Sequence, residues 1–194
     1  MGHKTTQRSS FYLVAMLCVV LFPWAATWGQ GVPQVSFSAK INDGTCSVSL
    51  EPNAINFKNV IASDFSVPGT TTEIQSLQLT LKDCQGLPDG SLKAGITTVG
   101  GVASFDPYLY RDSSSTSDGV GVLLRAEKYT DKRDFYDTSK AVISGGRSYE
   151  LAVGSAPVSG KVLDYSLGFT NGNGHTSVTP GKLVATLTFR FSYH

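Results

Sequence analysis

Apolar and polar residues alternate strictly along the last part of the chain, from Leu183 to Tyr193. Successive side chains of a β-strand point to opposite faces, so this alternation predicts a long strand with one buried face. The printed chain ends at His194, and we therefore expect the neighbour on one edge of this strand to come from elsewhere. The apolar positions are Leu183, Ala185, Leu187, Phe189, Phe191 and Tyr193.

A second alternating segment lies near the other end of the chain, in residues 30–41. A turn signal made of Asn, Asp and Gly follows it in residues 42–44. Alternation alone leaves two interpretations open: an independent arm ahead of the domain, or the first strand of its sheet. The apolar positions of this segment are Val35, Phe37, Ala39 and Ile41.

Between these segments, short apolar or alternating runs are separated by turn signals rich in Gly, Pro, Asn and Asp. Long amphipathic helical patterns are lacking. The pattern therefore predicts one all-β domain, an immunoglobulin-like β-sandwich. The predicted strands are residues 45–50, 54–61, 73–84, 94–99, 120–128, 141–143, 149–153 and 162–169.

Four details of this middle part of the sequence lead to further local predictions. Residues 112–118, DSSSTSD, should form a polar, flexible loop, and residues 129–139 an exposed one. Gly145 and Gly146 lie between two short apolar runs, as in a β-hairpin. Ile74 is out of phase with the leucines of its strand, which a β-bulge or a late strand start would explain.

The first residues have the composition of a secretory signal peptide. Lys4 and Arg8 provide a positive start, and an apolar run follows in residues 11–22. This run is too short to span a membrane comfortably. We expect cleavage between residues 26 and 29, with the later position favoured, so residues 1–29 form the predicted signal peptide.

The chain has 194 residues, of which 41% are hydrophobic and 16% charged, and its formal net charge is +1. This length is enough for one domain with a substantial core. The balanced charge lacks the basic excess of nucleic-acid-binding proteins, so we expect no nucleic-acid partner. In a secreted chain Cys46 and Cys84 pair by default, with two free thiols as the alternative, whereas Cys18 lies in the predicted signal peptide.

The sequence contains no catalytic or cofactor-binding motif. Beyond the predicted signal peptide the histidines are His175 and His194, and no nucleophile-elbow motif accompanies them. The acidic residues are scattered, so no carboxylate pair is singled out for glycoside hydrolysis. We therefore expect neither an enzyme nor a bound metal or cofactor. A sugar-binding platform of tyrosines is a weaker alternative than ordinary packing for Tyr108, Tyr110, Tyr129 and Tyr136.

Four features in combination resemble the pilin subunits of bacterial chaperone–usher fimbriae, of the type 1-like kind. An alternating arm follows the signal peptide, and Cys46 comes soon after it, with Cys84 at the end of a later strand. Gly181 precedes the alternating last strand, in which Tyr193 is the penultimate residue of the chain. The resemblance covers the whole chain after the signal peptide.

This resemblance implies an incomplete immunoglobulin-like β-sandwich that lacks its last strand. A strand of a periplasmic chaperone would fill the resulting groove first, and the N-terminal arm of the next fimbrial subunit would replace it by donor-strand exchange. An outer-membrane usher is the third expected partner. The implied donor residues are Val35, Phe37, Ala39 and Ile41, and the implied acceptor and chaperone-binding residues are Gly181, Leu187, Phe189, Phe191 and Tyr193.

The implied domains are a donor arm in residues 30–43 and a pilin domain in residues 44–194. Many arms of this family carry glycine where this chain has Ala39. The extra methyl group either fits a roomier groove or slows strand exchange. The length leaves room for an arm but not for a receptor-binding domain, which favours a shaft or adaptor subunit. The expected location is the cell-surface fimbrium, reached through the periplasm, with a role in bacterial adhesion.

Two other functions stay open at this point. The first is a self-complete secreted carbohydrate-binding β-sandwich, in which residues 30–41 pair with the last strand of the same chain. The second is a secreted hydrolase, which needs a carboxylate pair that the sequence does not nominate.

Overall fold

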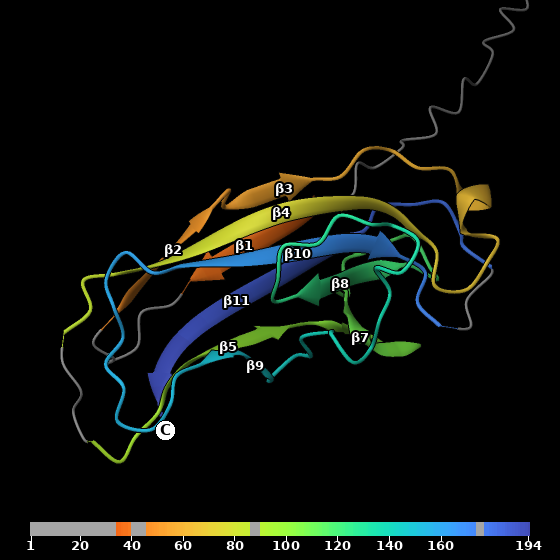
Figure 1. Ribbon diagram of the computed structural model, residues 1–194. Helices are drawn as coiled ribbons and strands as arrows, with labels where there is room; N and C mark the ends of the chain where they lie inside the picture. The colour runs from red at the N-terminus through yellow and green to blue at the C-terminus, as the bar shows by residue number, and fades with distance from the viewer. Residues whose placement is uncertain (1–33, 40–45, 86–89, 174–176) are drawn as a thin grey trace, which may run out of the picture.

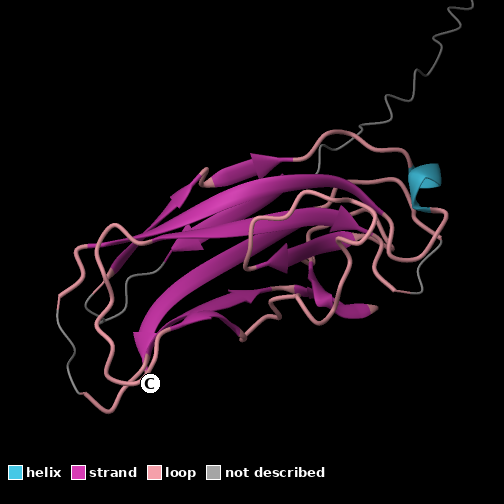
Figure 2. Cartoon of the chain, in the orientation of Figure 1, coloured by secondary structure: helices cyan, strands magenta, loops and turns pink. Residues whose placement is uncertain are grey.

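The computed structural model describes residues 34–39, 46–85, 90–173 and 177–194. The predicted signal peptide lies outside these residues. In the described part, all regular structure is β-strand except one short 3-10 helix, η1 (Ala62–Phe65) (Figure 2). No helix in these residues is long and apolar enough to cross a membrane. The strands are β1 (Gln34–Ala39), β2 (Ser47–Glu51), β3 (Ala54–Asn56), β4 (Thr71–Lys82), β5 (Ala94–Gly100), β6 (Val102–Ala103), β7 (Asp106–Tyr110), β8 (Gly121–Arg125), β9 (Arg147–Glu150), β10 (Val162–Thr170) and β11 (Val184–Tyr193).

The strands form two sheets that pack face to face (Figure 1). The five-stranded sheet has the order β3-β1-β11-β5-β9, and the six-stranded sheet has the order β2-β4-β10-β8-β7-β6. Strands β1 and β11 run parallel, whereas the other pairs of neighbours among the described strands are antiparallel. The predicted all-β sandwich is therefore confirmed.

The apolar row of β11 faces the core between the two sheets. Leu187 and Phe189 are fully buried, and the Phe189 ring meets the Tyr165 ring edge to face, with 5.2 Å between their centres. Strand alternation thus buries one face of β11, as predicted. The six-stranded sheet contributes Leu77, Leu79, Leu81, Tyr165, Leu167 and Phe169 to the same core.

Strand β4 explains why Ile74 is out of phase with its leucines. The ladder between β4 and β10 is regular from Ile74 to Leu79, so Ile74 and Leu77 point to opposite faces. Ile74 packs in a second cluster, around Leu109, Leu123 and Phe135. The expected bulge or late start is therefore the wrong explanation, because this strand is apolar on both faces at that point.

Two local predictions for the middle of the chain are wrong. Strands β6 and β7 lie in a stretch for which no strand was predicted. Gly145 and Gly146 form a turn, with the Gly146 amide donating to the Ile143 carbonyl, but not a hairpin. Strand β9 instead pairs with β5, a neighbour far away in the sequence.

Residues 129–139, predicted as an exposed loop, partly cover the outer face of the six-stranded sheet. Phe135 is 0% exposed. The guanidinium of buried Arg125 lies 3.8 Å from the centre of the Tyr129 ring and donates a hydrogen bond to the Phe135 carbonyl at 3.3 Å. A cation over an aromatic face is attracted by the ring electrons. This arrangement holds the loop on the sheet.

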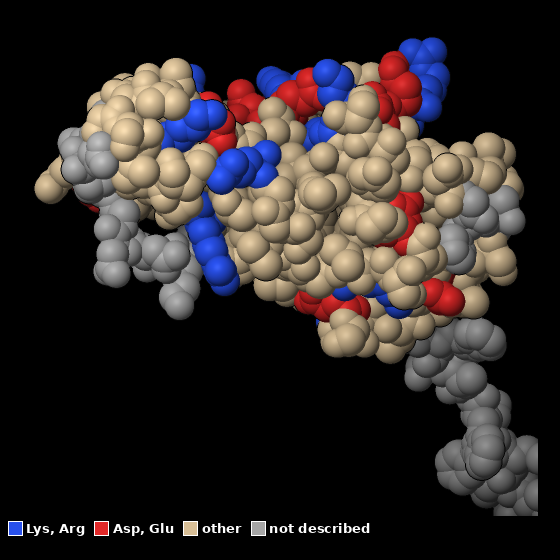
Figure 3. Space-filling view, turned by 90° about the horizontal axis from the view of Figure 1, so that it is seen from below, with Lys and Arg blue, Asp and Glu red and all other residues tan. Residues whose placement is uncertain are grey.

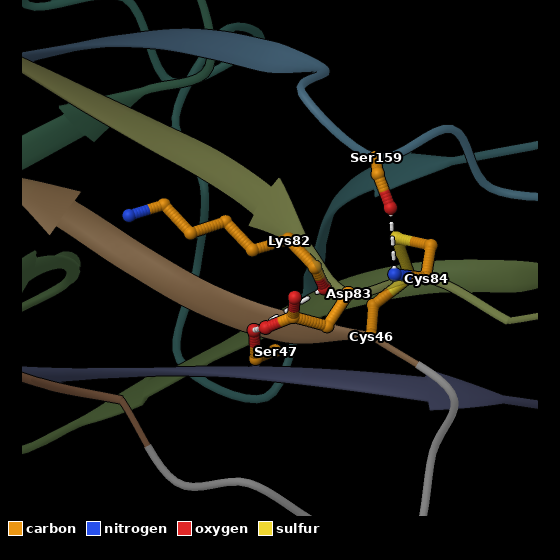
Figure 4. The surroundings of a disulfide bond; sticks show 6 residues. All are labelled: Cys46, Ser47, Lys82, Asp83, Cys84 and Ser159. Carbon is orange, nitrogen blue, oxygen red and sulfur yellow. Dashed lines mark hydrogen bonds between the residues drawn. A yellow bond between two sulfur atoms is a disulfide. The ribbon is translucent and has the colours of Figure 1, made fainter.

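The predicted disulfide is present between Cys46 and Cys84. It joins the residue before β2 to the residues that follow β4 (Figure 4). The Ser47 hydroxyl donates to the Asp83 carboxylate at 3.0 Å, and the Cys84 amide donates to the Ser159 hydroxyl at 2.7 Å. The chain is therefore fixed at the point where the N-terminal segment enters the domain.

Charged side chains are few and mixed in sign on the face shown in Figure 3. Uncharged residues dominate this face, and basic and acidic side chains lie in small groups. This face shows no broad basic surface of the kind that binds nucleic acid.

Gly168 of β10 provides a test of the outer cluster. A Cβ atom at this position would lie 2.2 Å from the Phe135 ring, so we expect Gly168→Ala to lower the free energy of unfolding by about 1–3 kcal/mol. Urea denaturation with the disulfide intact measures this change. Gly90→Ala is the control, because its Cβ would meet no atom within 4 Å. Equal midpoints for the two variants would contradict the proposed packing.

Candidate functional site

Strand β1 fills the space between β3 and β11 in the five-stranded sheet (Figure 1). It runs parallel to β11, with Gln34 opposite Val184 and Ala39 opposite Phe189. It also runs antiparallel to β3, where Val35 lies opposite Ile55. The amide of Gln34 donates to the Leu183 carbonyl at 2.9 Å. The neighbour that the last strand was expected to lack is thus supplied by the same chain.

Two side chains of β1 pack into the core of the sandwich. Val35 is 1% exposed and belongs to the main core cluster. Phe37 is half-buried, and its ring centre lies 6.5 Å from that of Phe189. Two of the four predicted donor residues are therefore seen to pack into the domain. The side chain of Ala39, and Ile41 altogether, lie outside the described part of the chain.

The predicted acceptor residues on β11 divide into two groups. Leu187 and Phe189 are buried and lie opposite described residues of β1. Phe191 is also buried, and its ring meets the partly buried Tyr193 ring edge to face at 5.3 Å. The described part of β1 ends opposite Phe189. The second group therefore lies beyond the observed pairing with β1.

Gly181 has a different place from the other predicted acceptor residues. It precedes β11, and a Cβ atom on it would lie 2.3 Å from the Ser117 amide nitrogen. No side chain fits at that distance. The close approach of backbone to backbone therefore accounts for this glycine, and the structure does not bring it against β1.

Residues 112–117 form an ordered segment beside β11, although we predicted a flexible, solvated loop. The Asp112 carboxylate accepts hydrogen bonds from the Thr186 amide at 3.1 Å and the Thr186 hydroxyl at 2.6 Å. The Ser115 hydroxyl bonds to both backbone groups of Val184 at 3.0 Å. Polar composition alone did not indicate these contacts, because serine and aspartate are equally common in solvated loops.

The C-terminal end of β11 is held by a group of charges. The backbones of Lys93 and His194 exchange two hydrogen bonds, of 2.8 and 3.0 Å. Glu150 of β9 contacts the Lys93 ammonium at 2.7 Å, the His194 ring at 3.0 Å and the Arg147 guanidinium at 3.3 Å. Its hydrogen bonds with Lys93 and then His194 lower the pKa of the Glu150 carboxyl.

The residues that the structure describes offer little that could bind a metal ion or a sugar. They contain no group of three or more His, Cys, Asp or Glu side chains placed to hold a metal ion. Of the four tyrosines considered for a sugar-binding platform, Tyr110 is buried in the core and cannot take part. Tyr129 and Tyr136 line one open cleft, but their hydroxyls already donate to Asp134 and Asp106.

The pattern of a β-sandwich with this last strand corresponds to a known family. The model of the fimbrial protein family matches residues 35–194. The chain belongs to the fimbrial protein family. The resemblance expected from the sequence is therefore confirmed, and the protein is a structural subunit of a fimbria. No curated protein matches the chain.

Two solved structures resemble the fimbrial subunit at low sequence identity. The P pilus rod subunit PapA is 16% identical with a TM-score of 0.50, and the match covers 82% of this chain and 99% of that protein. An antigen and type I fimbria protein from Burkholderia pseudomallei is 19% identical with a TM-score of 0.49, covering 84% and 94%. At this identity the match to PapA supports the fold.

The charge group around Glu150 predicts a specific dependence on pH. Because its pKa is lower in the folded than in the unfolded chain, Glu150 stabilises the fold above its ordinary pKa of 4.5 and loses this effect as pH falls through the folded value. We expect the difference in melting temperature between the parent and Glu150→Gln to shrink between about pH 6 and about pH 3. The exposed Glu51→Gln is the control. A difference that stays constant over this range would contradict the assignment.

Proposed function

We propose that this fimbrial subunit polymerises by donor-strand exchange, in which residues 30–43 of one subunit enter the space between β3 and β11 of another. The single observation that carries the proposal is that this space holds a separate N-terminal strand. Strand β1 contacts both of its neighbours through backbone pairing. An identical arm from a second subunit offers the same backbone groups and the same apolar side chains.

The energetic need for an occupant supports this proposal. Without β1, strands β3 and β11 would each present an open edge, which is a hazard for aggregation. The core would also lose Val35, and burial of such a side chain contributes roughly 1.5–3 kcal/mol as an upper estimate. A subunit therefore needs a strand in this space at every stage of its life. Only the source of that strand can change.

The pairing of β1 with its own domain suggests why a periplasmic chaperone is needed. The arm is joined to Cys46 through residues 40–45 alone, so its effective concentration at its own groove is high. An isolated subunit would therefore close on itself. We propose that a chaperone strand occupies the groove until an outer-membrane usher brings the next subunit, and that the assembled fimbria lies on the cell surface.

The remaining features of the proposal follow from the sequence. Residues 1–29 would direct secretion into the periplasm, residues 30–43 would act as the donor arm and residues 44–194 as the acceptor domain. The role is structural rather than catalytic. Val35, Phe37, Ala39 and Ile41 would enter the next subunit, against Leu187, Phe189, Phe191 and Tyr193, and Gly181 would serve the acceptor indirectly through its contact with Ser117.

One observation favours a second candidate, the self-complete secreted β-sandwich. The pairing of β1 with β11 inside one chain is the arrangement that this candidate requires. The two candidates differ in whether the arm can be exchanged. A self-complete domain would stay monomeric at any concentration and would not take up an arm from another molecule.

A substitution in the arm tests the proposal. We expect Phe37→Arg to stop a subunit from acting as donor, because a charged side chain would be placed against Phe189. Capture of the same variant by the chaperone should not be weakened, since the substitution lies in the arm and leaves β3 and β11 unchanged. Co-expression with tagged wild-type subunits and the chaperone measures both, as fibre length and as the yield of chaperone complex.

Ser36→Arg is the matched control, because position 36 lies on the opposite face of the same strand. It should leave fibre length close to that of the parent. Equal loss of fibre joining and chaperone capture in Phe37→Arg would count against separate donor and acceptor roles. Normal fibres from Phe37→Arg subunits would show that the arm is not the donor.

A further inference from the structure

The edge of β11 that faces away from β1 changes its hydrogen-bonding partner part-way along the strand. From Leu187 onward this edge pairs with β5, with Leu187 opposite Gly100 and Tyr193 opposite Ala94. Ahead of Leu187, strand β5 has ended. Here the edge faces residues 112–117, which we call the edge loop.

The edge loop replaces a strand with a mixture of side-chain and backbone hydrogen bonds. Besides its two contacts with Thr186, Asp112 donates its amide to the Val184 carbonyl at 2.7 Å. Ser115 satisfies both backbone groups of Val184. The Thr116 hydroxyl accepts from the Lys182 amide at 2.8 Å, and the Thr116 amide donates to the Lys182 carbonyl at 2.8 Å.

The edge loop is itself held in place from behind. The Arg111 guanidinium donates to the carbonyls of Ser115, Ser117 and Val120. Gly181 allows the loop backbone to approach where a side chain would collide with Ser117. The loop therefore has a defined position and is not merely draped over the strand.

The edge loop and β1 contact opposite edges of the same residues. Backbone groups of neighbouring residues in a strand point to opposite sides. Those of Lys182, Val184 and Thr186 face the edge loop, whereas the Leu183 carbonyl faces β1. If β1 leaves, this half of β11 keeps the edge loop as its hydrogen-bonding neighbour among the described residues, while the second half keeps β5.

We infer that the edge loop is a positioning element for donor-strand binding, with Asp112 and Ser115 as its principal residues. It keeps the first half of the acceptor strand extended when the groove is empty, so that an incoming arm finds a preformed edge. It also occupies the opposite edge, so that a strand can add to this half of β11 only from the side of β3. This inference rests on the donor-strand exchange proposed above.

The test uses the mature chain carrying Phe37→Arg, so that its own arm is held less tightly in the groove. The probe is a fluorescent synthetic peptide with the sequence of residues 30–41. Fluorescence anisotropy measures its affinity and association rate. We expect Asp112→Ala added to this background to weaken peptide binding about tenfold, since two charge-assisted hydrogen bonds that order the acceptor are lost.

Two matched variants separate positioning from general stability. Asp112→Asn keeps an acceptor for the Thr186 amide and a polar partner for its hydroxyl, so it should restore most of the affinity. Asp137→Ala removes a carboxylate that likewise accepts two hydrogen bonds, from the amide and hydroxyl of Ser139, but lies away from β11. It should leave peptide binding unchanged. Melting temperatures of all variants provide the comparison for stability.

A second measurement covers the case in which Asp112→Ala in the Phe37→Arg background does not fold. Ser115→Ala in the chain with its natural arm removes both hydroxyl contacts to Val184. Hydrogen exchange followed by mass spectrometry should then show faster exchange in residues 182–186 than in residues 188–193. Uniform exchange over the whole of β11 would overturn the inference.

The outcomes distinguish this inference from the function on which it rests. If the Phe37→Arg chain does not bind the peptide although hydrogen exchange shows that its own residues 34–39 are unprotected, donor-strand exchange is overturned and the inference with it. If the chain binds the peptide and Asp112→Ala binds it equally well, the edge loop has no positioning role, while the proposed function stands. Weaker binding that simply follows the melting temperature, including in Asp137→Ala, would assign a structural role only and would likewise overturn the inference.

Discussion

Strand β11 must have a hydrogen-bonding neighbour on each edge and an apolar partner over its buried face, and the rest of the structure depends on meeting this need. An unpaired buried amide or carbonyl costs free energy comparable to a lost hydrogen bond. One edge is met by β5 and the edge loop, and the other by β1. Of these three neighbours, β1 is the one that comes before the disulfide in the sequence.

This difference between the two edges relates the fold to assembly. The contacts of β11 with β5 form within a fixed sandwich, whereas β1 reaches its place through a short connection ahead of the disulfide. The donor-strand exchange proposed above requires that an arm from another chain can take the place of β1 in this ladder. Within one chain, the short connection favours pairing of the arm with its own domain.

The remaining interactions hold other parts of the sandwich together. The disulfide fixes the start of β2 against the end of β4. The outer cluster around Phe135 packs on the six-stranded sheet, and the group around Glu150 links the end of β11 to β5 and β9. Of these contacts, the edge loop and the group around Glu150 lie along β11, the strand beside the space that β1 fills. A groove whose walls are fixed in advance binds a strand at a lower cost in ordering.

The sequence by itself determined the sandwich class, the disulfide between Cys46 and Cys84, the buried face of β11 and the alternation of the arm. Each of these features depends directly on the type and order of the side chains. Only the tertiary structure decided which strands are neighbours, that β1 runs parallel to β11, and that the polar residues 112–117 cover one edge of β11. Backbone hydrogen bonds are the same for every residue type except proline, so pairing leaves little trace in sequence. Likewise, burial of Phe135 and the close approach at Gly181 depend on segments that are distant along the chain.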